Sequence, residues 1–492
     1  MKRVFLALFL FTILSGVNAS SETHVVAIVA QDQTALRAAA RASAPQQALL
    51  WQGEALEIRA ERLDWLQVYD YRRERGGYVR ASQVRRVALE AGEAPALLAL
   101  VRFLRDAAGS ETLGIAFAAA YVQVAPADVL KGPDGIEVLD ALGGMADRLA
   151  RRASSGTAQG AAARALAAHL EVAARQGLRF ESNERSGRMY VCYEGDAFRR
   201  VLAMPSTPEQ RARAVLGLTR PECSPDELQP AQLRRKDEWR AEVLDRVDTR
   251  SLPPYLANRV LLRRASVLSS LAYQRARAGE RPEAAASRAL LELAKVDKAE
   301  LAEEDTAAYR DAAMRVSASR WGIAAGALSG PQRKPSLVAL AGAKGETCLL
   351  LVDERNDAER PLARRCTYGL VWTASATLNR EGNALAVAVQ PADAWRELWI
   401  FHRQAAGWTV RVLPPAATQP EVGYAEFAGW VPGGSQVLVA REASGEGRYR
   451  RNFELVRLDT LATVRQAPDP AMLGAFQRWQ DPAWKRATVS LR

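Results

Sequence analysis

Residues 65–71 read Trp-Leu-Gln-Val-Tyr-Asp-Tyr, and this stretch decides the fold of the first part of the chain. Alternate side chains of a β-strand point to opposite faces. Leu66 and Val68 therefore share one face, which we expect to point into a hydrophobic core, and the aromatic residues share the other. Short apolar or alternating segments lie on both sides from His24 to Val87, separated by polar turns. The pattern predicts a small all-β unit.

Four short motifs carry a resemblance in this region: Leu36-Arg37, Gly53-Glu54, Trp65-Leu66-Gln67-Val68 and Gly77-Tyr78-Val79. In this order they resemble the bacterial SH3 domain family over residues 24–88. The resemblance implies an SH3-like β-barrel that binds cell-wall peptides or proteins. The stretch 37–40, Arg-Ala-Ala-Ala, departs from the Asn-Val-Arg-x-Gly-Pro of the family, which puts the ligand contact of that loop in question.

The outward face of this strand offers the candidate ligand-binding site. Exposed rings beside arginine side chains form a shallow groove that suits a peptide or a sugar ring. A bulge that turns the tryptophan inward is the alternative for that one residue. The candidate residues are Trp65, Tyr69, Tyr71, Arg72 and Tyr78.

The first nineteen residues have the three parts of a secretory signal peptide. Lys2 and Arg3 are followed by an apolar run from Val4 to Leu14 and by small residues up to Ala19. We expect a signal peptide over residues 1–19, export to the periplasm or beyond, no lipid anchor and no later membrane span.

Four cysteines follow in the exported part of the chain. Cys192 with Cys223 and Cys348 with Cys366 each fall within one predicted domain, so we favour these two disulfides among the three possible pairings. A metal site or a nucleophilic thiol is the alternative, but neither a Cys-x-x-Cys spacing nor an adjacent His supports it.

Helical periodicity dominates residues 93–325, which we expect to form an all-α domain. The segment 255–278 places Leu261, Ala265, Leu268 and Ala272 on one face, so this helix must pack against another. With the segment up to residue 294 it resembles a single tetratricopeptide helix pair. A generic antiparallel helix pair is the alternative, because the period does not recur.

The segment Gly326-Ala-Leu-Ser-Gly-Pro331 predicts a linker, and strand patterns return over residues 333–492. Phe427-x-x-Trp430 recurs as Phe476-x-x-Trp479, and paired strands follow glycine turns. This rhythm resembles the blades of a β-propeller, although the length suffices for only about three or four blades. A propeller-like array and a β-sandwich both remain open.

Composition and motifs exclude several functions. The formal net charge of +11 is modest for 492 residues and forms no aromatic-interleaved stripe, so we expect no nucleic-acid partner. The three histidines, at positions 24, 169 and 402, lie in three different predicted domains. Metal-hydrolase, serine-hydrolase and nucleotide-binding motifs are absent from the sequence, so we expect no metal and no cofactor.

These patterns together predict an exported, non-enzymatic binding or scaffold protein of the bacterial cell envelope, whose partner is a cell-wall peptide or an envelope protein. An envelope sensor is a further possibility, and the oligomeric state is open. A peptidoglycan hydrolase or lyase is the alternative from another class, because a glycosidase needs only two suitably placed carboxylates. Glu181, Glu184 and Glu194, beside Cys192, are the candidates for its acid.

Overall fold

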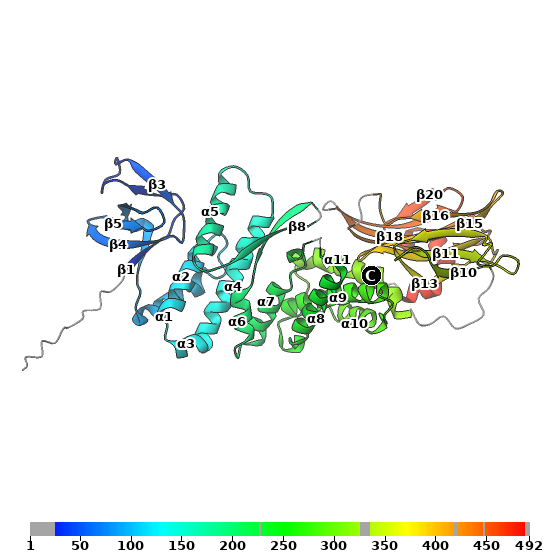
Figure 1. The fold of residues 1–492 in the computed structure, drawn as a ribbon, viewed down its shortest axis with the longest axis horizontal. Helices are drawn as coiled ribbons and strands as arrows, with labels where there is room; N and C mark the ends of the chain where they lie inside the picture. Colours follow the sequence, from blue (N-terminus) through cyan, green and yellow to red (C-terminus); the bar gives the residue numbers. More distant parts are fainter. Residues whose placement is uncertain are drawn as a thin grey trace, which may run out of the picture. The chain divides into compact units, whose positions relative to one another are not determined.

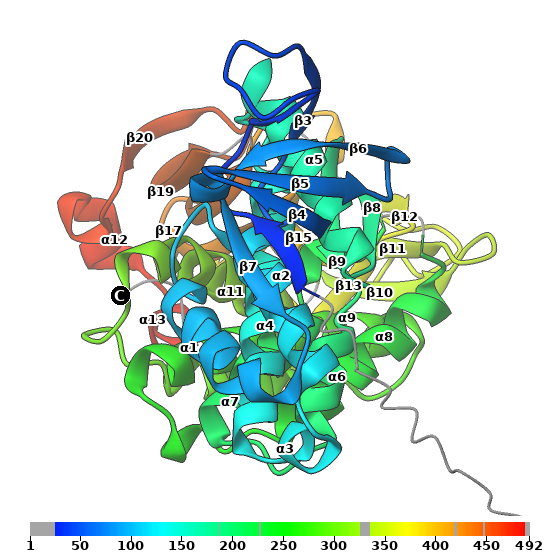
Figure 2. The same cartoon turned by 90° about the vertical axis from the view of Figure 1, so that its left-hand side faces the viewer.

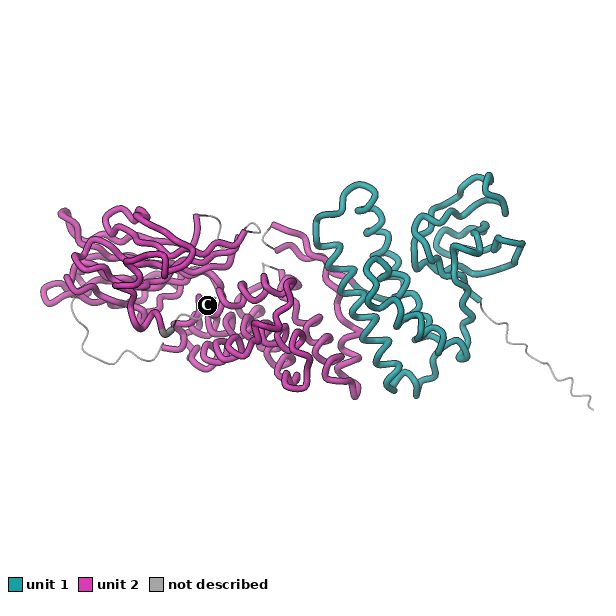
Figure 3. Tube along the Cα trace, turned by 180° about the vertical axis from the view of Figure 1, so that it is seen from behind, with its two compact units in different colours: residues 1–179 teal, residues 180–492 magenta. Residues whose placement is uncertain are grey.

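A computed structural model describes residues 25–185, 187–225, 228–324, 335–417, 421–445 and 448–487. The predicted signal peptide, His24 and the predicted linker at 326–331 lie outside these residues. The chain divides into two compact units, 1–179 and 180–492 (Figure 3). An N-terminal sheet, a central helical region and a C-terminal mixed sheet confirm the coarse multidomain prediction. The division at residue 179 places the predicted helical region partly in each unit.

The first unit begins with a seven-stranded sheet of order β3-β2-β6-β5-β4-β1-β7. Within the described residues no pairing between β3 and β7 closes this sheet into a barrel. Leu66 and Val68 are fully buried with Val79 in its core, so the predicted orientation of the strand is confirmed. The strands are β1 (Val25–Val29), β2 (Thr34–Arg37), β3 (Gln46–Leu50), β4 (Ala55–Arg62), β5 (Trp65–Asp70), β6 (Arg75–Arg80) and β7 (Val84–Ala88).

Five helices complete the first unit, and α2 packs against both α1 and α4. A Cβ atom on Gly114 of α2 would lie 2.3 Å from the sulfur of Met145 on α4, so glycine permits this close approach. Gly132 and Pro133 start α4, as expected for a proline at the first helical position. The helices are α1 (Ala94–Leu104), α2 (Glu111–Val124), α3 (Ala127–Lys131), α4 (Pro133–Ser154) and α5 (Ala161–Arg175).

The second unit opens with a hairpin of β8 (Phe180–Arg185) and β9 (Arg188–Tyr193), so the prediction that residues 93–325 are all-α is wrong for this segment. Six helices follow, and the long α9 packs against α7, α8, α10 and α11. The four residues predicted to share one face of α9 are all buried. The helices are α6 (Asp196–Leu202), α7 (Pro208–Leu218), α8 (Pro230–Asp245), α9 (Pro254–Arg277), α10 (Glu283–Ala294) and α11 (Thr306–Ser319).

The β part of the second unit contains three antiparallel meanders (Figure 1). A two-residue parallel contact between β15 and β17 joins the second meander to the third. The first meander is β10 (Ser336–Ala341), β11 (Thr347–Val352) and β12 (Ala363–Thr367). The second is β13 (Leu370–Leu378), β14 (Ala384–Ala392), β15 (Trp395–Gln404) and β16 (Gly407–Leu413). The third is β17 (Val422–Val431), β18 (Gln436–Gly445), β19 (Arg448–Arg457) and β20 (Thr463–Ala467).

Successive side chains of a β-strand point to opposite faces of the sheet. The strands of the second and third meanders therefore contribute side chains to two different apolar layers. On β14, Leu385 and Val387 pack toward the first meander, whereas Ala384 and Ala386 pack toward the third. On β18, Leu438 packs instead with α12 (Gly474–Trp479) and α13 (Pro482–Ala487). The meanders are therefore stacked face to face, but no propeller is closed within the described residues.

The predicted repeat of Phe427-x-x-Trp430 as Phe476-x-x-Trp479 is wrong in structural terms. The first motif lies on strand β17, whereas the second lies on helix α12. Phe476 contacts Phe453 and Trp484 and covers the outer face of the third meander. The same residue spacing therefore serves a strand in one place and a helix in the other.

Candidate functional site

The outer face of β4, β5 and β6 carries most of the predicted ligand-binding residues, and Figure 2 shows these strands side by side. Trp65 on β5 is opposite Arg80, Gln67 is opposite Tyr78, and Tyr69 is opposite Gly76. Because these positions alternate with buried Leu66 and Val68, their side chains lie on the outer side of the sheet.

Tyr69 and Tyr71 form the open part of this face. Their rings meet edge to face with centroids 4.9 Å apart, and Tyr71 is 69% exposed. The guanidinium of Arg59 lies 4.2 Å from the centroid of the Tyr69 ring, within cation–π range. The Tyr71 hydroxyl donates to Glu57 Oε2 at 2.8 Å, and this hydrogen bond raises the pKa of Tyr71. We call Glu57, Arg59, Tyr69 and Tyr71 the tyrosine surface.

Trp65 does not extend this open surface, because its side chain is only 7% exposed. The guanidinium of Arg80 lies over the indole, 4.9 Å from the ring centroid. Tyr78, on the neighbouring strand, is half-buried. The predicted exposure of an aromatic stripe is therefore correct for Tyr71, partial for Tyr69 and Tyr78, and wrong for Trp65.

Arg72 points into a partly buried ion-pair network instead of a groove. Its guanidinium contacts Glu54 at 3.3 Å and Glu171 of α5 at 2.6 Å. Arg73 pairs with the same Glu54 at 2.8 Å and with Asp70 at 2.5 Å. Glu54 and Asp70 are buried carboxylates, and such groups require cationic partners. The prediction that Arg72 supplies the positive charge beside the rings is therefore wrong, and Arg59 lies there.

On the side of the sheet where Arg72 lies, side-chain contacts connect the sheet to the helices of the first unit. His169 on α5 is buried and contacts Asp32 Oδ1 through Nε2 at 2.8 Å. Trp51 meets the imidazole edge to face. Gly53 has a φ of +86°, and a Cβ there would lie 2.5 Å from the carbonyl oxygen of Thr112, so the turn requires glycine. The tyrosine surface is thus presented by a sheet fixed to its own helices.

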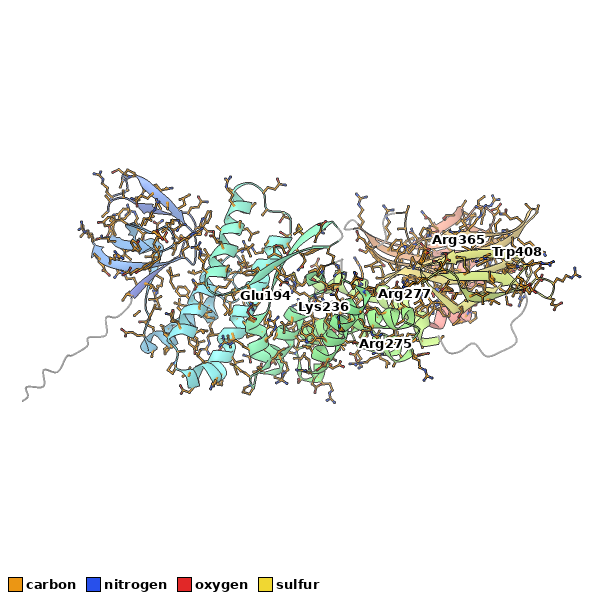
Figure 4. All side chains as sticks on the ribbon, in the orientation of Figure 1. Glu194, Lys236, Arg275, Arg277, Arg365 and Trp408 are labelled. Carbon is orange, nitrogen blue, oxygen red and sulfur yellow. A yellow bond between two sulfur atoms is a disulfide. The ribbon has the colours of Figure 1, made fainter. Side chains whose placement is uncertain are left out.

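Both predicted disulfides are present. Cys192 on β9 bonds to Cys223 before α8. Lys236 on α8, labelled in Figure 4, donates to the Cys223 carbonyl oxygen at 2.7 Å. Burial lowers the pKa of Lys236 to about 8. Cys348 and Cys366 are directly opposite each other on β11 and β12.

The sole group of potential metal ligands in the described part of the chain is Glu346 with Cys348 and Cys366. A metal-binding thiolate must carry a free sulfur. Both sulfurs here are bonded to each other, so this group is a disulfide beside a carboxylate.

None of the three carboxylates predicted as candidates for the acid of a glycosidase is fully buried. Glu181 and Glu184 are exposed on β8, and Glu194 is half-buried after β9. A different pair, Asp237 on α8 and Asp393 in the β14–β15 turn, approaches Ser270 on α9. Ser270 donates to Asp237 Oδ2 at 2.9 Å, and burial raises the pKa of Asp393. No local sequence pattern indicates this cluster, because its members come from three distant segments.

Buried charges also lie where the helices of the second unit meet its sheet. Glu426 on β17 pairs with Arg320, which follows α11, and with Arg396 on β15 at 3.4 Å. Arg396 is fully buried and donates to the carbonyl oxygen of Ser317 at 2.5 Å. Burial lowers the pKa of Arg320 to about 10. We call Arg320, Glu426 and Arg396 the arginine triad.

Comparison with models of protein families, with curated proteins and with solved structures finds no match for this chain. Among the helices of the described residues, none has the length and apolar character needed to cross a membrane.

Proposed function

We propose that this chain is an exported binding protein of the bacterial cell envelope, and that the tyrosine surface of its first unit holds a cell-wall peptide or protein. The observation that carries the proposal is the exposed Tyr71 ring beside Tyr69 and Arg59 on a sheet face that the helices leave open. The rings provide a surface on which a ligand can stack. The neighbouring guanidinium provides a positive charge that can pair with a carboxylate of the ligand. The resemblance of residues 24–88 to bacterial SH3 domains supports the same ligand class.

The cysteine pairing supports an oxidising compartment for the mature chain. Disulfides persist in the periplasm and outside the cell and are rare in the cytosol. Both cysteine pairs of the chain are bonded. We therefore keep export, with cleavage before Ser20, as part of the proposal. Sequencing the N-terminus of protein recovered from the periplasm checks it, and an intact Met1 contradicts it.

We expect Tyr71→Ala and Tyr69→Ala to weaken binding of the full chain to purified peptidoglycan, measured by co-sedimentation, by about tenfold or more each. Truncation of an aromatic anchor removes contact area that a central interface residue supplies. The melting temperature should stay nearly constant for Tyr71→Ala, because the ring is exposed and its loss opens no cavity.

Two controls make the result specific. Tyr368→Ala removes another exposed ring, 62% exposed, from the second unit and should leave binding unchanged. Leu66→Ala on the inner face of β5 should lower the free energy of unfolding by about 2 to 5 kcal/mol, because it creates a cavity in the sheet core. If both tyrosine variants co-sediment with peptidoglycan as well as the wild type does, the proposal is contradicted. Clearing of peptidoglycan in a gel would instead favour the hydrolase or lyase alternative.

A further inference from the structure

Helix α11 of the second unit lies on strands β17 and β18 of the same unit. Met314 and Ala318 of the helix pack with Val422 and Tyr424 of the sheet, and Tyr449 covers the edge of this layer. This layer is apolar, and the arginine triad lies beside it in the same contact, where Arg396 donates to the carbonyl oxygen of Ser317 on α11. A group that becomes charged next to the apolar layer without a compensating partner weakens the contact.

Glu442 lies beside this contact, on the same face of the sheet as Tyr424. It is on β18, 1% exposed, and directly opposite Tyr424 on β17 and Arg451 on β19. Both of its carboxyl oxygens are buried, and the only side chains that hydrogen-bond to it among the described residues are Tyr424 and Tyr449. A carboxylate in such surroundings loses its hydration without full compensation.

The groups that face Glu442 come from each neighbouring element. Tyr424 on β17 and Tyr449 and Arg451 on β19 favour the ionised carboxylate. From α11, Arg310 lies over the Tyr449 ring at 4.9 Å. Burial outweighs these effects and raises the pKa of Glu442 to about 7.

A second carboxyl at the junction of the helices and the sheet responds in the same direction. Asp393 lies 4.0 Å from Arg315 of α11, close to Ser270 and Asp237. Arg315 and Arg185 lower its pKa and Asp237 raises it, but burial is the largest cause and the net shift is upward.

We propose that the contact between α11 and the sheet is a pH-responsive clasp, closed while Glu442 is protonated and loosened when Glu442 ionises. Asp393 adds to the same response. The clasp is separate from the tyrosine surface, so it does not depend on the proposed ligand. For a protein outside the cytoplasm, whose surroundings follow the external pH, such a clasp couples acidity to the packing of the second unit.

Proton linkage gives the direction in which the stability of the closed form changes with pH. When α11 opens, Glu442 meets water and returns to its ordinary pKa of 4.5. The closed form therefore binds the proton more tightly than the open form does. The stability advantage of the closed form over the open form is complete when the pH is below the ordinary pKa of Glu442. The advantage declines as the pH rises toward about 7 and stays low above it.

Hydrogen exchange of the α11 amides in the full chain tests the clasp. After correction for intrinsic exchange, we expect their protection to fall on the order of 50-fold between about pH 5 and about pH 8. Glu442→Gln keeps the shape but cannot ionise, so most of this fall should disappear. Glu354→Gln removes an exposed carboxylate outside the contact and should retain the full pH dependence.

Each outcome decides the proposal. Constant protection of wild-type α11 across this pH range, or protection that rises with pH, overturns it. An equal fall in wild type and Glu442→Gln also overturns it, because another group would then be responsible. If Glu442→Gln does not fold, the wild-type profile together with Asp393→Asn, expected to reduce the fall partially, still provides the decision.

Discussion

Replacing Glu426 by alanine should lower the free energy of unfolding of the second unit by about 3 to 5 kcal/mol. Glu426 is the anion between Arg320 and Arg396, and the side chain of Arg396 is fully buried. Without the carboxylate, two buried guanidinium groups repel each other in a medium that solvates neither. Denaturant unfolding of the full chain, followed by the fluorescence of tryptophans in the β part, measures the loss.

An exposed pair in the same unit provides the matched control. Arg457 and Asp459 form an ion pair at 2.5 Å, with side chains 54% and 45% exposed. Asp459→Asn should change the free energy of unfolding by less than about 1 kcal/mol, because water screens this pair. A loss at Glu426→Ala no larger than at Asp459→Asn would show that the arginine triad does not hold the helices on the sheet.

Removal of the disulfide between Cys192 and Cys223 should cost the second unit about 3 to 4 kcal/mol. The bond closes a loop between residues 31 positions apart and ties the β8–β9 hairpin to the segment before α8. The double variant Cys192→Ser, Cys223→Ser avoids an unpaired thiol. Thermal and denaturant unfolding under non-reducing conditions give the change in stability.

The second disulfide gives an internal comparison. Cys348 and Cys366 are 18 positions apart, and the ladder between β11 and β12 already pairs their strands. The chain-entropy account therefore predicts a smaller loss, by about 0.5 kcal/mol, for the corresponding double serine variant. A larger loss at this disulfide than at the first would contradict that account.

Local patterns predicted the parts of the fold that depend on nearby residues. Alternation at Leu66 and Val68 gave the inner face of β5, and the apolar face of residues 255–278 gave the buried side of α9. The two cysteine pairs followed from the expectation that each bond stays within one predicted domain. In each case the deciding information lies within one element or one predicted domain.

The errors in the predicted site arose where contacts between residues far apart in the sequence determine where a side chain lies. Arg72 was assigned to the candidate site because it follows Tyr71, but its partner Glu171 lies 99 positions away on α5. Trp65 is covered by Arg80, a neighbour only through the register of β5 and β6. Asp393 and Glu426 acquire their roles only when the sheet meets the helices. A single sequence has no local signal for such contacts.

The stacked meanders have a consequence for the order of folding. The outer face of the third meander carries Leu438 and Phe453, and Phe476 and Trp484 of the last two helices cover it. When a chain emerges from the ribosome or a translocon with its N-terminus first, these two aromatic residues arrive after all eleven strands of the meanders. Until then, a nearly complete sheet exposes an apolar surface, and such surfaces drive intermolecular association. We therefore expect this intermediate to need chaperone protection late in synthesis, and shortening the chain before Phe476 to cause aggregation even though every strand is present.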